Sequence, residues 1–200
     1  GSNFIYKFLG LGDEVHLLVR PESNFWRIAP VKEKTRAHIV DLENEELLGK
    51  FILKLKPEIV LHFASYGAYP RREKDTRKTI ITNVLGSVNL FNSCAKADVK
   101  CLINTGSSSE YGKKENPMKE SDILEPNNLY GVTKAAATMY CNLLSRKSGQ
   151  PFITMRIFSA YGPFEDSGRF IPVLARSVVF DESLNLSSPK AVRDFIFIDD

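Results

Sequence analysis

The sequence is poor in the residues that hold metals and disulfides. Among its 200 residues it has three cysteines, three histidines and one tryptophan. The odd number of cysteines, set in apolar surroundings, is typical of reduced thiols, so we expect Cys94, Cys101 and Cys141 to be core thiols of a cytoplasmic protein. The histidines fall in separate segments without the spacing of metal ligands, and no metal site is expected.

Long apolar runs and blocks of one charge are missing as well. No run approaches the ~20 apolar residues of a membrane span, and we expect neither a membrane partner nor a secretory signal. The net charge is only +3 and the basic residues are scattered, so nucleic acid is not an expected partner. The short charged cluster at 71–74 is interpreted as a solvated loop. The composition, 43% hydrophobic and 26% charged, is that of a globular protein that can bury a substantial core.

Short β-branched runs alternate with longer amphipathic segments along the chain. Several of the runs are almost continuously apolar, which is typical of parallel strands covered on both faces. This alternation predicts an α/β fold with a doubly wound parallel sheet. The expected strands are 15–19, 37–40, 58–63, 100–105, 152–158 and 195–198, and the expected helices are 3–9, 45–55, 75–97, 129–147 and 170–180.

Lys134 follows Tyr130 by four residues, downstream of a hydroxyl-rich cluster at 105–109. Residues four apart lie on one face of a helix, so the ammonium can sit beside the phenol and favour its ionised form. Such a phenol, next to a hydroxyl that binds a carbonyl or alcohol oxygen, can move a proton during hydride transfer. Of the seven tyrosines, only Tyr130 has a lysine four residues on. The alternative is an amphipathic helix that carries an exposed tyrosine and lysine.

Further motifs surround this pair in a fixed order. They are Asp41-Leu42, His62-Phe63-Ala64-Ser65, Asn83-Val84-Leu85-Gly86, the stretch 105–112, and the stretches 156–163 and 193–200. With them, the sequence resembles the extended short-chain dehydrogenase/reductase family over essentially its whole length. More narrowly, it resembles the nucleotide-sugar epimerase, dehydratase and ketoreductase branch. Any one motif could arise by chance, whereas the ordered set could not.

The resemblance implies a role for each motif. Tyr130 is the expected acid/base. Lys134 is expected both to favour the ionised phenol and to bind the cofactor ribose. Ser107 is the expected catalytic hydroxyl, with Ser108 as the alternative. At least one serine of the cluster is expected only to satisfy its own turn. The expected cofactor is NADP or NAD, and the expected substrate is a nucleotide-diphosphate sugar. Expected cofactor contacts are Gly1, Arg20, Asp41, Leu42, Phe63, Ala64, Ser65, Asn83, Thr105, Tyr130, Lys134 and Phe158; expected substrate contacts are Ser108, Ser159, Arg169 and Arg193.

The sequence departs from the family pattern in three places. Dehydratases of this branch carry an Asp-Glu pair after the catalytic hydroxyl. This chain has Ser108 and Ser109 there, with Glu110 one place later, so dehydratase activity is not expected. Arg20 ends a strand where an NAD enzyme usually has an acidic residue; it either pairs with the 2′-phosphate of NADP or is a solvated arginine. Ser159 stands where asparagine is frequent, which leaves its contact to the substrate open.

We therefore expect an enzyme that transfers hydride at C4 of a nucleotide-activated hexose. A 4-ketoreductase would consume its cofactor once per turnover and would agree with Arg20, whereas an epimerase would keep its cofactor and return the hydride to the other face of the sugar. The two stay open. A non-catalytic dinucleotide-binding sensor or scaffold is the rival, although it would have no need of the serine, tyrosine and lysine together. Helices 75–97 and 129–147 resemble those that pair between subunits in this family, which implies a homodimer.

The two ends of the sequence are unlike those of a whole Rossmann-type domain. The chain opens into a helix at Gly1 without a preceding strand, so we expect the first strand and most of the phosphate loop to be lacking, and this stretch alone to be inactive. Gly1 is either a cloning remnant or the last glycine of that loop; the unbroken helix favours the latter. We expect an NAD(P)-binding domain over 1–160 and the start of a substrate-binding lobe over 161–200, with the chain returning to the sheet at 193–200.

Overall fold

The computed structural model describes residues 1–68, 75–186 and 192–200. The chain divides into two compact units, and each is described by itself. The first contains Gly1–His16, Asn24–Arg36 and Phe158–Asp200, and the second contains Leu17–Ser23 and Ala37–Ile157. The predicted solvated loop at 71–74 lies outside the described residues.

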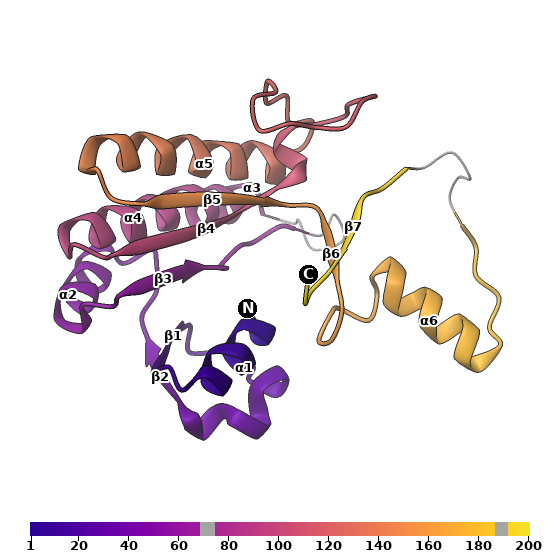
Figure 1. The fold of residues 1–200 in the computed structure, drawn as a ribbon, viewed down its shortest axis with the longest axis horizontal. Coiled ribbons are helices and arrows are strands. Elements are labelled where there is room, and N and C mark those ends of the chain that lie inside the picture. The colour runs from indigo at the N-terminus through magenta and orange to yellow at the C-terminus, as the bar shows by residue number, and fades with distance from the viewer. Residues whose placement is uncertain (69–74, 187–191) are drawn as a thin grey trace. The chain divides into compact units, whose positions relative to one another are not determined.

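A parallel sheet forms the centre of the second unit (Figure 1). Its strands, in spatial order, are β3 (Ile59–His62), β4 (Cys101–Ser107) and β5 (Phe152–Ile157). Ile59 is the partner of Cys101 in the parallel register of β3 and β4. The predicted α/β fold with a parallel sheet is thereby confirmed.

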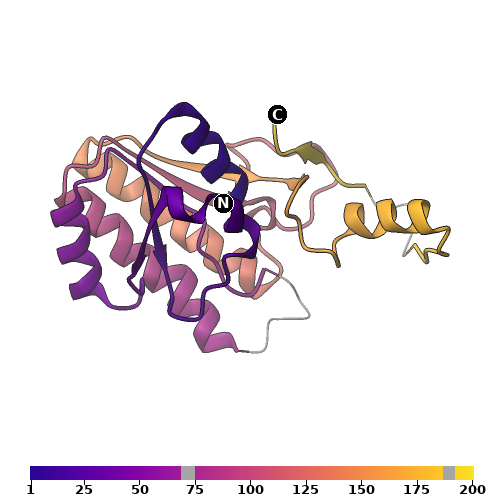
Figure 2. The ribbon, with the colours of Figure 1, turned by 90° about the horizontal axis from the view of Figure 1, so that it is seen from below.

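Helices cover one face of this sheet. They are α2 (Glu45–Leu55), α3 (Thr76–Ile80), α4 (Gly86–Lys96) and α5 (Leu129–Ser148). Figures 1 and 2 show α4 and α5 lying side by side along the sheet, and α2 packs on α4. Asn44, Asp75 and Asn128 begin three of these helices, because each side chain accepts a hydrogen bond from a backbone N–H of the first turn.

The core of the second unit lies between these helices and the sheet. Its buried apolar side chains come from α2, α4, α5, the strands β4 and β5 and the loops beside them, and burial of such area is the main source of stability. Cys94 and Cys141 are buried free thiols, as predicted, whereas Cys101 is only partly buried. The cluster consists of Val40, Leu48, Ile52, Leu90, Phe91, Cys94, Val99, Leu102, Cys141 and Phe152.

Two further strands, β1 (Val15–Val19) and β2 (Thr35–Ile39), form a two-stranded sheet. The 3-10 helix η1 (Trp26–Lys34) connects them and has no counterpart among the predicted elements. The three histidines lie on β1, β2 and β3, and the described ranges contain no group of three possible metal ligands. Among those residues, no helix has both the length and the apolar character needed to span a membrane.

The first unit contains α1 (Ser2–Leu11), α6 (Phe170–Phe180) and the parallel pair β6 (Ser159–Tyr161) and β7 (Phe195–Phe197). Over 193–200 the chain forms β7, which pairs with β6, and the predicted return of this segment to the main sheet stays a prediction. The ring of Tyr6 stacks on Phe164 with centroids 5.4 Å apart, and Arg27 Nε donates to the Phe164 carbonyl oxygen at 2.9 Å. These contacts join α1, η1 and the segment after β6.

Candidate functional site

The carboxyl ends of β3 and β4 lie beside each other, and the hydroxyl-rich cluster 105–109 begins in the last residues of β4. Thr105 Oγ1 donates to the His62 carbonyl oxygen at 2.7 Å. Ser107 is the last residue of β4, and the short 3-10 helix η3 (Ser108–Glu110) begins directly after it. Ligands of open α/β sheets bind at the carboxyl ends of the strands, so this end of the sheet is the candidate site.

Glu110 holds the backbone of the serine turn. Its Oε1 accepts from Ser107 N at 2.8 Å, while Ser107 Oγ accepts from Ser109 N at 3.1 Å. The Glu110 side chain is 0% exposed, and its Oε2 accepts from Arg156 Nε at 2.9 Å. A carboxylate is stable at such a depth only with partners of this kind. The result is a fixed position for Ser107 at the end of β4.

The N-terminus of α5 packs on the same turn. A Cβ atom at Gly131 would lie 2.4 Å from the Ser109 carbonyl oxygen, so only glycine permits this close approach. Tyr130, the second residue of α5, precedes this contact directly. Its carbonyl oxygen accepts from Thr133 Oγ1 at 2.8 Å. The structure therefore brings the predicted acid/base and the predicted catalytic hydroxyl onto two elements in direct contact.

Lys134 lies one turn further along α5 and is 3% exposed. Burial lowers its pKa from the ordinary value of 10.5 to about 8, and the nearby Glu110 carboxylate opposes this fall. Burial, together with the Lys134 charge, also lowers the pKa of His62 from 6.5 to about 3. The His62 ring lies within hydrogen-bond distance of Ser87 Oγ, 2.9 Å from Nε2. Lys134 is therefore an interior lysine, whereas the alternative interpretation required an exposed one.

Asn83 ties the segment after β3 to α5. Its Oδ1 accepts from Tyr66 N at 2.7 Å, and its Nδ2 donates to the Tyr66 carbonyl oxygen and to Thr133 Oγ1. Asn83 lies in η2 (Ile81–Leu85), a π-helical turn that divides the predicted helix 75–97 into α3 and α4. The segment that it holds contains Phe63, Ala64 and Ser65. Contact of these residues with a cofactor stays a prediction.

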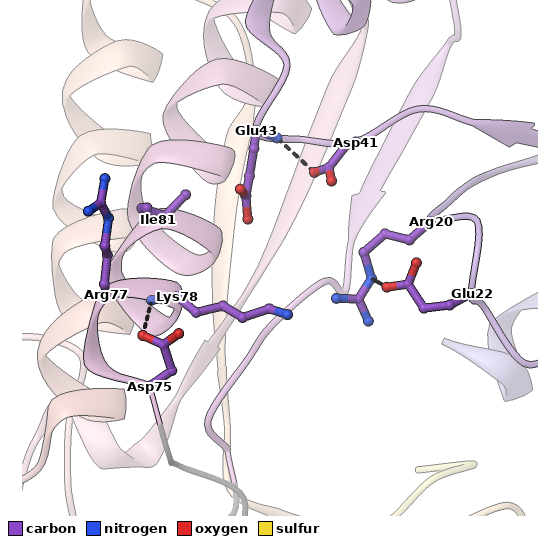
Figure 3. Close-up of a pocket in the computed structure, with 8 residues that line it drawn as sticks. All are labelled: Arg20, Glu22, Asp41, Glu43, Asp75, Arg77, Lys78 and Ile81. Atoms are coloured by element: carbon purple, nitrogen blue, oxygen red, sulfur yellow. Dashed lines mark hydrogen bonds and ion pairs between the residues drawn. The ribbon is translucent and has the colours of Figure 1, made fainter.

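A pocket of about 330 Å³ lies beside the ends of β1 and β2 (Figure 3). Arg20, which follows β1, and Asp41, which comes soon after β2, both line it. Leu42 packs against α4, and the Leu42 carbonyl oxygen accepts a hydrogen bond from Asn89 Nδ2 of that helix at 2.9 Å. The full lining is Arg20, Glu22, Asp41, Glu43, Asp75, Arg77, Lys78 and Ile81.

The predicted substrate contacts, apart from Ser108, lie in the first unit. Ser159 begins β6, and its N–H donates to the Asp194 carbonyl oxygen at 3.2 Å, which places Arg193 at the same end of the β6–β7 pair. Arg169 begins α6 and pairs through Nε with Glu165 Oε1 at 3.0 Å. This unit also contains Gly1, before α1, and Phe158, before β6.

Glu110, its partner Arg156 and Lys78 are among the residues here that the sequence does not identify. Glu110 follows the serine cluster, but its partner Arg156 stands 46 positions away. Lys78 resembles any solvated helix lysine in the sequence. Only the folded chain places it in the same pocket as Arg20 and Asp41.

Comparison with known proteins gives matches along the whole chain. Residues 1–200 match the model of the NAD dependent epimerase/dehydratase family. The UDP-glucose 4-epimerase of Lactobacillus helveticus is 26% identical over 188 residues, which cover 85% of this chain and 57% of that protein. The chain spans about half the length of the curated relatives it matches, with 52%, 57% and 50% covered in three of them.

Solved structures share the fold. A UDP-glucose 4-epimerase from Thermotoga maritima, solved with UDP-glucose, has a TM-score of 0.87 at 22% identity over 100% of this chain and 66% of that one. A dTDP-glucose 4,6-dehydratase from Streptomyces venezuelae, solved with NAD bound, has a TM-score of 0.85 at 24% identity over 100% of this chain and 65% of that one. The predicted Rossmann-type fold is confirmed by this likeness.

Proposed function

Because this chain belongs to the NAD dependent epimerase/dehydratase family, we propose that the protein modifies a nucleotide-activated sugar by hydride transfer at C4, with NAD or NADP as its cofactor. The observation that carries the proposal is the packing of Gly131 on Ser109, which brings Tyr130 to the serine turn with Lys134 buried one turn away. The names of the relatives, which are nucleotide-sugar epimerases and dehydratases, support the substrate class.

The residues present fit a dinucleotide. The pocket at the ends of β1 and β2 combines carboxylates, which accept hydrogen bonds from ribose hydroxyls, with cations, which bind phosphate. Lys134 offers a buried ammonium or amine on the neighbouring helix α5. When bound, the nicotinamide would exchange a hydride with the sugar carbon. Asp41, Leu42 and the 63–65 segment are proposed to hold the adenosine half.

Three side chains are proposed to act on the sugar. Tyr130 moves the proton of the C4 hydroxyl, and Ser107 holds the C4 oxygen by a hydrogen bond. Lys134 favours the ionised phenol and donates a hydrogen bond to the cofactor ribose. Ser108, Ser159, Arg169 and Arg193 are proposed as substrate contacts from the family resemblance, the arginines as ligands of the diphosphate.

The environment of Glu110, the acid nearest the proposed catalytic serine, favours hydride transfer without elimination of water. Glu110 is fully buried and bonded to Ser107 N and Arg156 Nε, so it is not placed to serve as an acid on the sugar. A 4-ketoreductase and a 4-epimerase are both compatible with this arrangement. Stoichiometric loss of reduced cofactor absorbance with a 4-keto sugar nucleotide would identify the reductase, and epimer formation without net cofactor change would identify the epimerase.

The decisive variant is Tyr130→Phe in the whole protein. It removes one hydroxyl and keeps the ring, so the fold should persist while turnover falls by about 100-fold or more. Tyr140→Phe is the matched control, because it removes a hydroxyl from the same helix, where that hydroxyl bonds to Asn92 Oδ1, and it should leave turnover close to the unsubstituted level. Full activity in Tyr130→Phe would refute the catalytic proposal and favour a dinucleotide-binding scaffold.

A homodimer is proposed on the exposed face of α5. Val132, Met139 and Leu143 are 47%, 58% and 39% exposed, and their spacing places them on one side of the helix. A self-complementary helix pair would cover them. Light scattering should report a dimer that Met139→Glu converts to a monomer, whereas a monomeric unsubstituted protein would contradict the proposal.

The cytoplasm is proposed as the compartment of the protein. Cys94 and Cys141 are free and buried, and burial raises the pKa of Cys94 to about 12. Buried thiols that stay reduced and unpaired are typical of proteins from a reducing compartment. Recovery of the native protein only from a secreted or membrane fraction would contradict this assignment.

A further inference from the structure

The carboxylate of Glu110 lies in the layer between β4 and the helices. Leu102, Asn104 and Gly106 alternate along β4 and are buried, and Leu102 belongs to the core that α4 and α5 share with the sheet. Gly106 therefore faces the same helices. A Cβ atom on Gly106 would lie 2.6 Å from Glu110 Oε1, so the carboxylate occupies the space that a side chain at this position would fill. Figure 1 shows α5 lying along this face of the sheet.

Arg156 enters the same space from β5. It is the register partner of Gly106, and a Cβ atom on Gly106 would lie 3.2 Å from Arg156 Cγ. Arg156 Nε donates to Glu110 Oε2 at 2.9 Å, and the guanidinium lies over the Tyr111 ring, 4.9 Å from its centroid. Both charges are largely shielded from water, so they act on neighbouring groups more strongly than surface charges do.

Lys134 reaches this layer from α5. Its side chain is buried, and because burial disfavours an ammonium, its pKa falls from 10.5 to about 8. The Glu110 carboxylate acts in the opposite direction and raises the pKa. Glu110 thus interacts with two cations: it binds Arg156 through a hydrogen bond and stabilises the charged form of Lys134 through space.

The elements that pack most closely on α5 carry, within the described residues, no carboxylate besides Glu110. Asp75 and Glu125, on the segments beside α5, are exposed, so water weakens their effect on Lys134. His62 on β3 is buried with a pKa of about 3, and its ring is neutral above that pH. Tyr130 lies one turn before Lys134 on α5 itself. The further ionisable groups on the packed elements are Arg77 and Lys78 on α3, Cys94 and Lys96 on α4, and Cys101 on β4.

We propose that Glu110 is a positioning residue that keeps the Lys134 ammonium charged near neutral pH, and that Arg156, as a second cation on the same carboxylate, limits this effect. This inference rests on the proposed function, because the charge of Lys134 is what favours the ionised phenol of Tyr130. One side chain then acts on both halves of the site. Glu110 Oε1 holds the Ser107 N–H of the serine turn, and the negative charge of Glu110 acts on α5.

Heteronuclear NMR of the whole protein, with lysine isotopically labelled at Cε, follows the protonation of Lys134 directly, and Lys134→Arg identifies its signal by removing it. Glu110→Gln keeps an oxygen that can accept from Ser107 N and removes the charge. It should lower the pKa of Lys134 by about 1 or more, since a neighbouring buried charge has an effect of that size. Arg156→Met removes the competing cation and should raise the pKa by a smaller amount.

Two further variants complete the test. Glu58→Gln removes a carboxylate from an exposed pair with Lys100, and as the matched control it should leave the pKa of Lys134 unchanged. The double variant Glu110→Gln, Arg156→Met removes both members of the buried pair together and should fold even where a single variant does not. Its Lys134 pKa should still lie below that of the unsubstituted protein, because Glu110 acts on Lys134 more strongly than Arg156 does.

The direction of the shift separates an effect of charge from an effect of structure. A variant that only loosens the core admits water around Lys134, which would raise its pKa toward 10.5. A raised or unchanged pKa in Glu110→Gln, or in the double variant where the single one does not fold, would therefore overturn the inference. An equal response to Glu58→Gln would overturn it as well.

The NMR titration requires neither cofactor nor substrate, so its outcome is independent of the proposed function. In the active protein, the alkaline limit of kcat/KM should move to lower pH in Glu110→Gln, in step with Lys134. A lowered pKa of Lys134 in this variant, in a protein that turns over no nucleotide sugar, would support the inference and refute the proposed function. Turnover of a nucleotide sugar with an unchanged pKa of Lys134 and an unchanged alkaline limit would overturn the inference and leave hydride transfer in place.

Discussion

Gly131 lies so close to Ser109 that a Cβ atom on it would stand 2.4 Å from the Ser109 carbonyl oxygen. The helix α5 and the 3-10 helix η3 thus approach each other closely, with no side chain between them at this point. Because Tyr130 and Ser107 flank this contact in sequence, the distance between the proposed acid/base and the proposed hydroxyl depends on a single missing methyl group.

Gly131→Ala should therefore move α5 away from the serine turn. The clash is with backbone, which yields less easily than a side chain, so we expect a loss of stability of about 1–3 kcal/mol and a larger loss of turnover. Urea unfolding and steady-state kinetics would measure the two effects. Gly10→Ala is the matched control, because a Cβ at Gly10 in α1 meets nothing within 4 Å. It should be neutral or stabilising by up to about 1 kcal/mol. Equal behaviour of the two variants would contradict the proposed role of the contact.

Alanine substitutions of Ser107, Ser108 and Ser109 should distinguish the roles of their three hydroxyl groups. We expect Ser107→Ala to lower kcat by about 100-fold, since it removes the hydrogen bond to the reacting oxygen. Ser109→Ala should act only through the fold, because the structure assigns its N–H, and not its hydroxyl, to the turn. Ser108→Ala should raise KM more than it lowers kcat, as expected for a substrate contact. A larger loss of kcat in Ser108→Ala than in Ser107→Ala would exchange their roles.

Much of the fold could be predicted because the signals are local. β1, α2 and α6 begin and end as predicted from apolar periodicity. The start of α2 is also held locally, because the Asn44 side chain accepts a hydrogen bond from Leu47 N three residues on. The order of motifs likewise predicts which residues meet at the carboxyl ends of the strands, since parallel strands share that edge.

Other features depend on partners far apart in sequence. The π-helical turn at Ile81–Leu85 contains Asn83, whose side chain forms hydrogen bonds with Tyr66 and Thr133. No residue pattern within 75–97 predicts this turn. The 3-10 helix η1 has neither a helical nor a strand period and contains Pro30. The role of Glu110 requires Arg156 from another strand. Such contacts appear only when the chain has folded.

The buried pair of Glu110 and Arg156 should be costly to break. Their side chains are 0% and 16% exposed, so removal of one charge leaves the other with little water. We expect Glu110→Ala to lower the free energy of unfolding by about 3–5 kcal/mol, measured by urea titration. The double variant Glu110→Leu, Arg156→Leu should recover part of this loss, because no buried charge remains. Glu58→Gln in the exposed pair with Lys100 should change stability little. A double variant less stable than Glu110→Ala would contradict this account.

His62 should make the protein sensitive to acid. Burial and the nearby Lys134 hold its pKa at about 3 in the folded protein, against 6.5 ordinarily. As the pH falls below 6.5, His62 becomes protonated in the unfolded chain. In the folded chain it stays neutral until about pH 3. The free energy of unfolding should therefore decline across this window, by up to about 1.4 kcal/mol per pH unit from this residue. Above pH 6.5 the contribution of His62 should be constant.

His62→Gln removes the titrating ring. As the pH falls from 7 to 5, the variant should therefore lose less free energy of unfolding than the unsubstituted protein. Urea titrations at several pH values measure this directly. Ser87→Ala separates the hydrogen bond from the titration, because it removes the partner of the ring and leaves the ring buried. It should lower stability by about 1 kcal/mol at neutral pH while keeping the acid slope. A parallel pH dependence in His62→Gln and the unsubstituted protein would place the acid sensitivity elsewhere, in the carboxylates that the fold pairs.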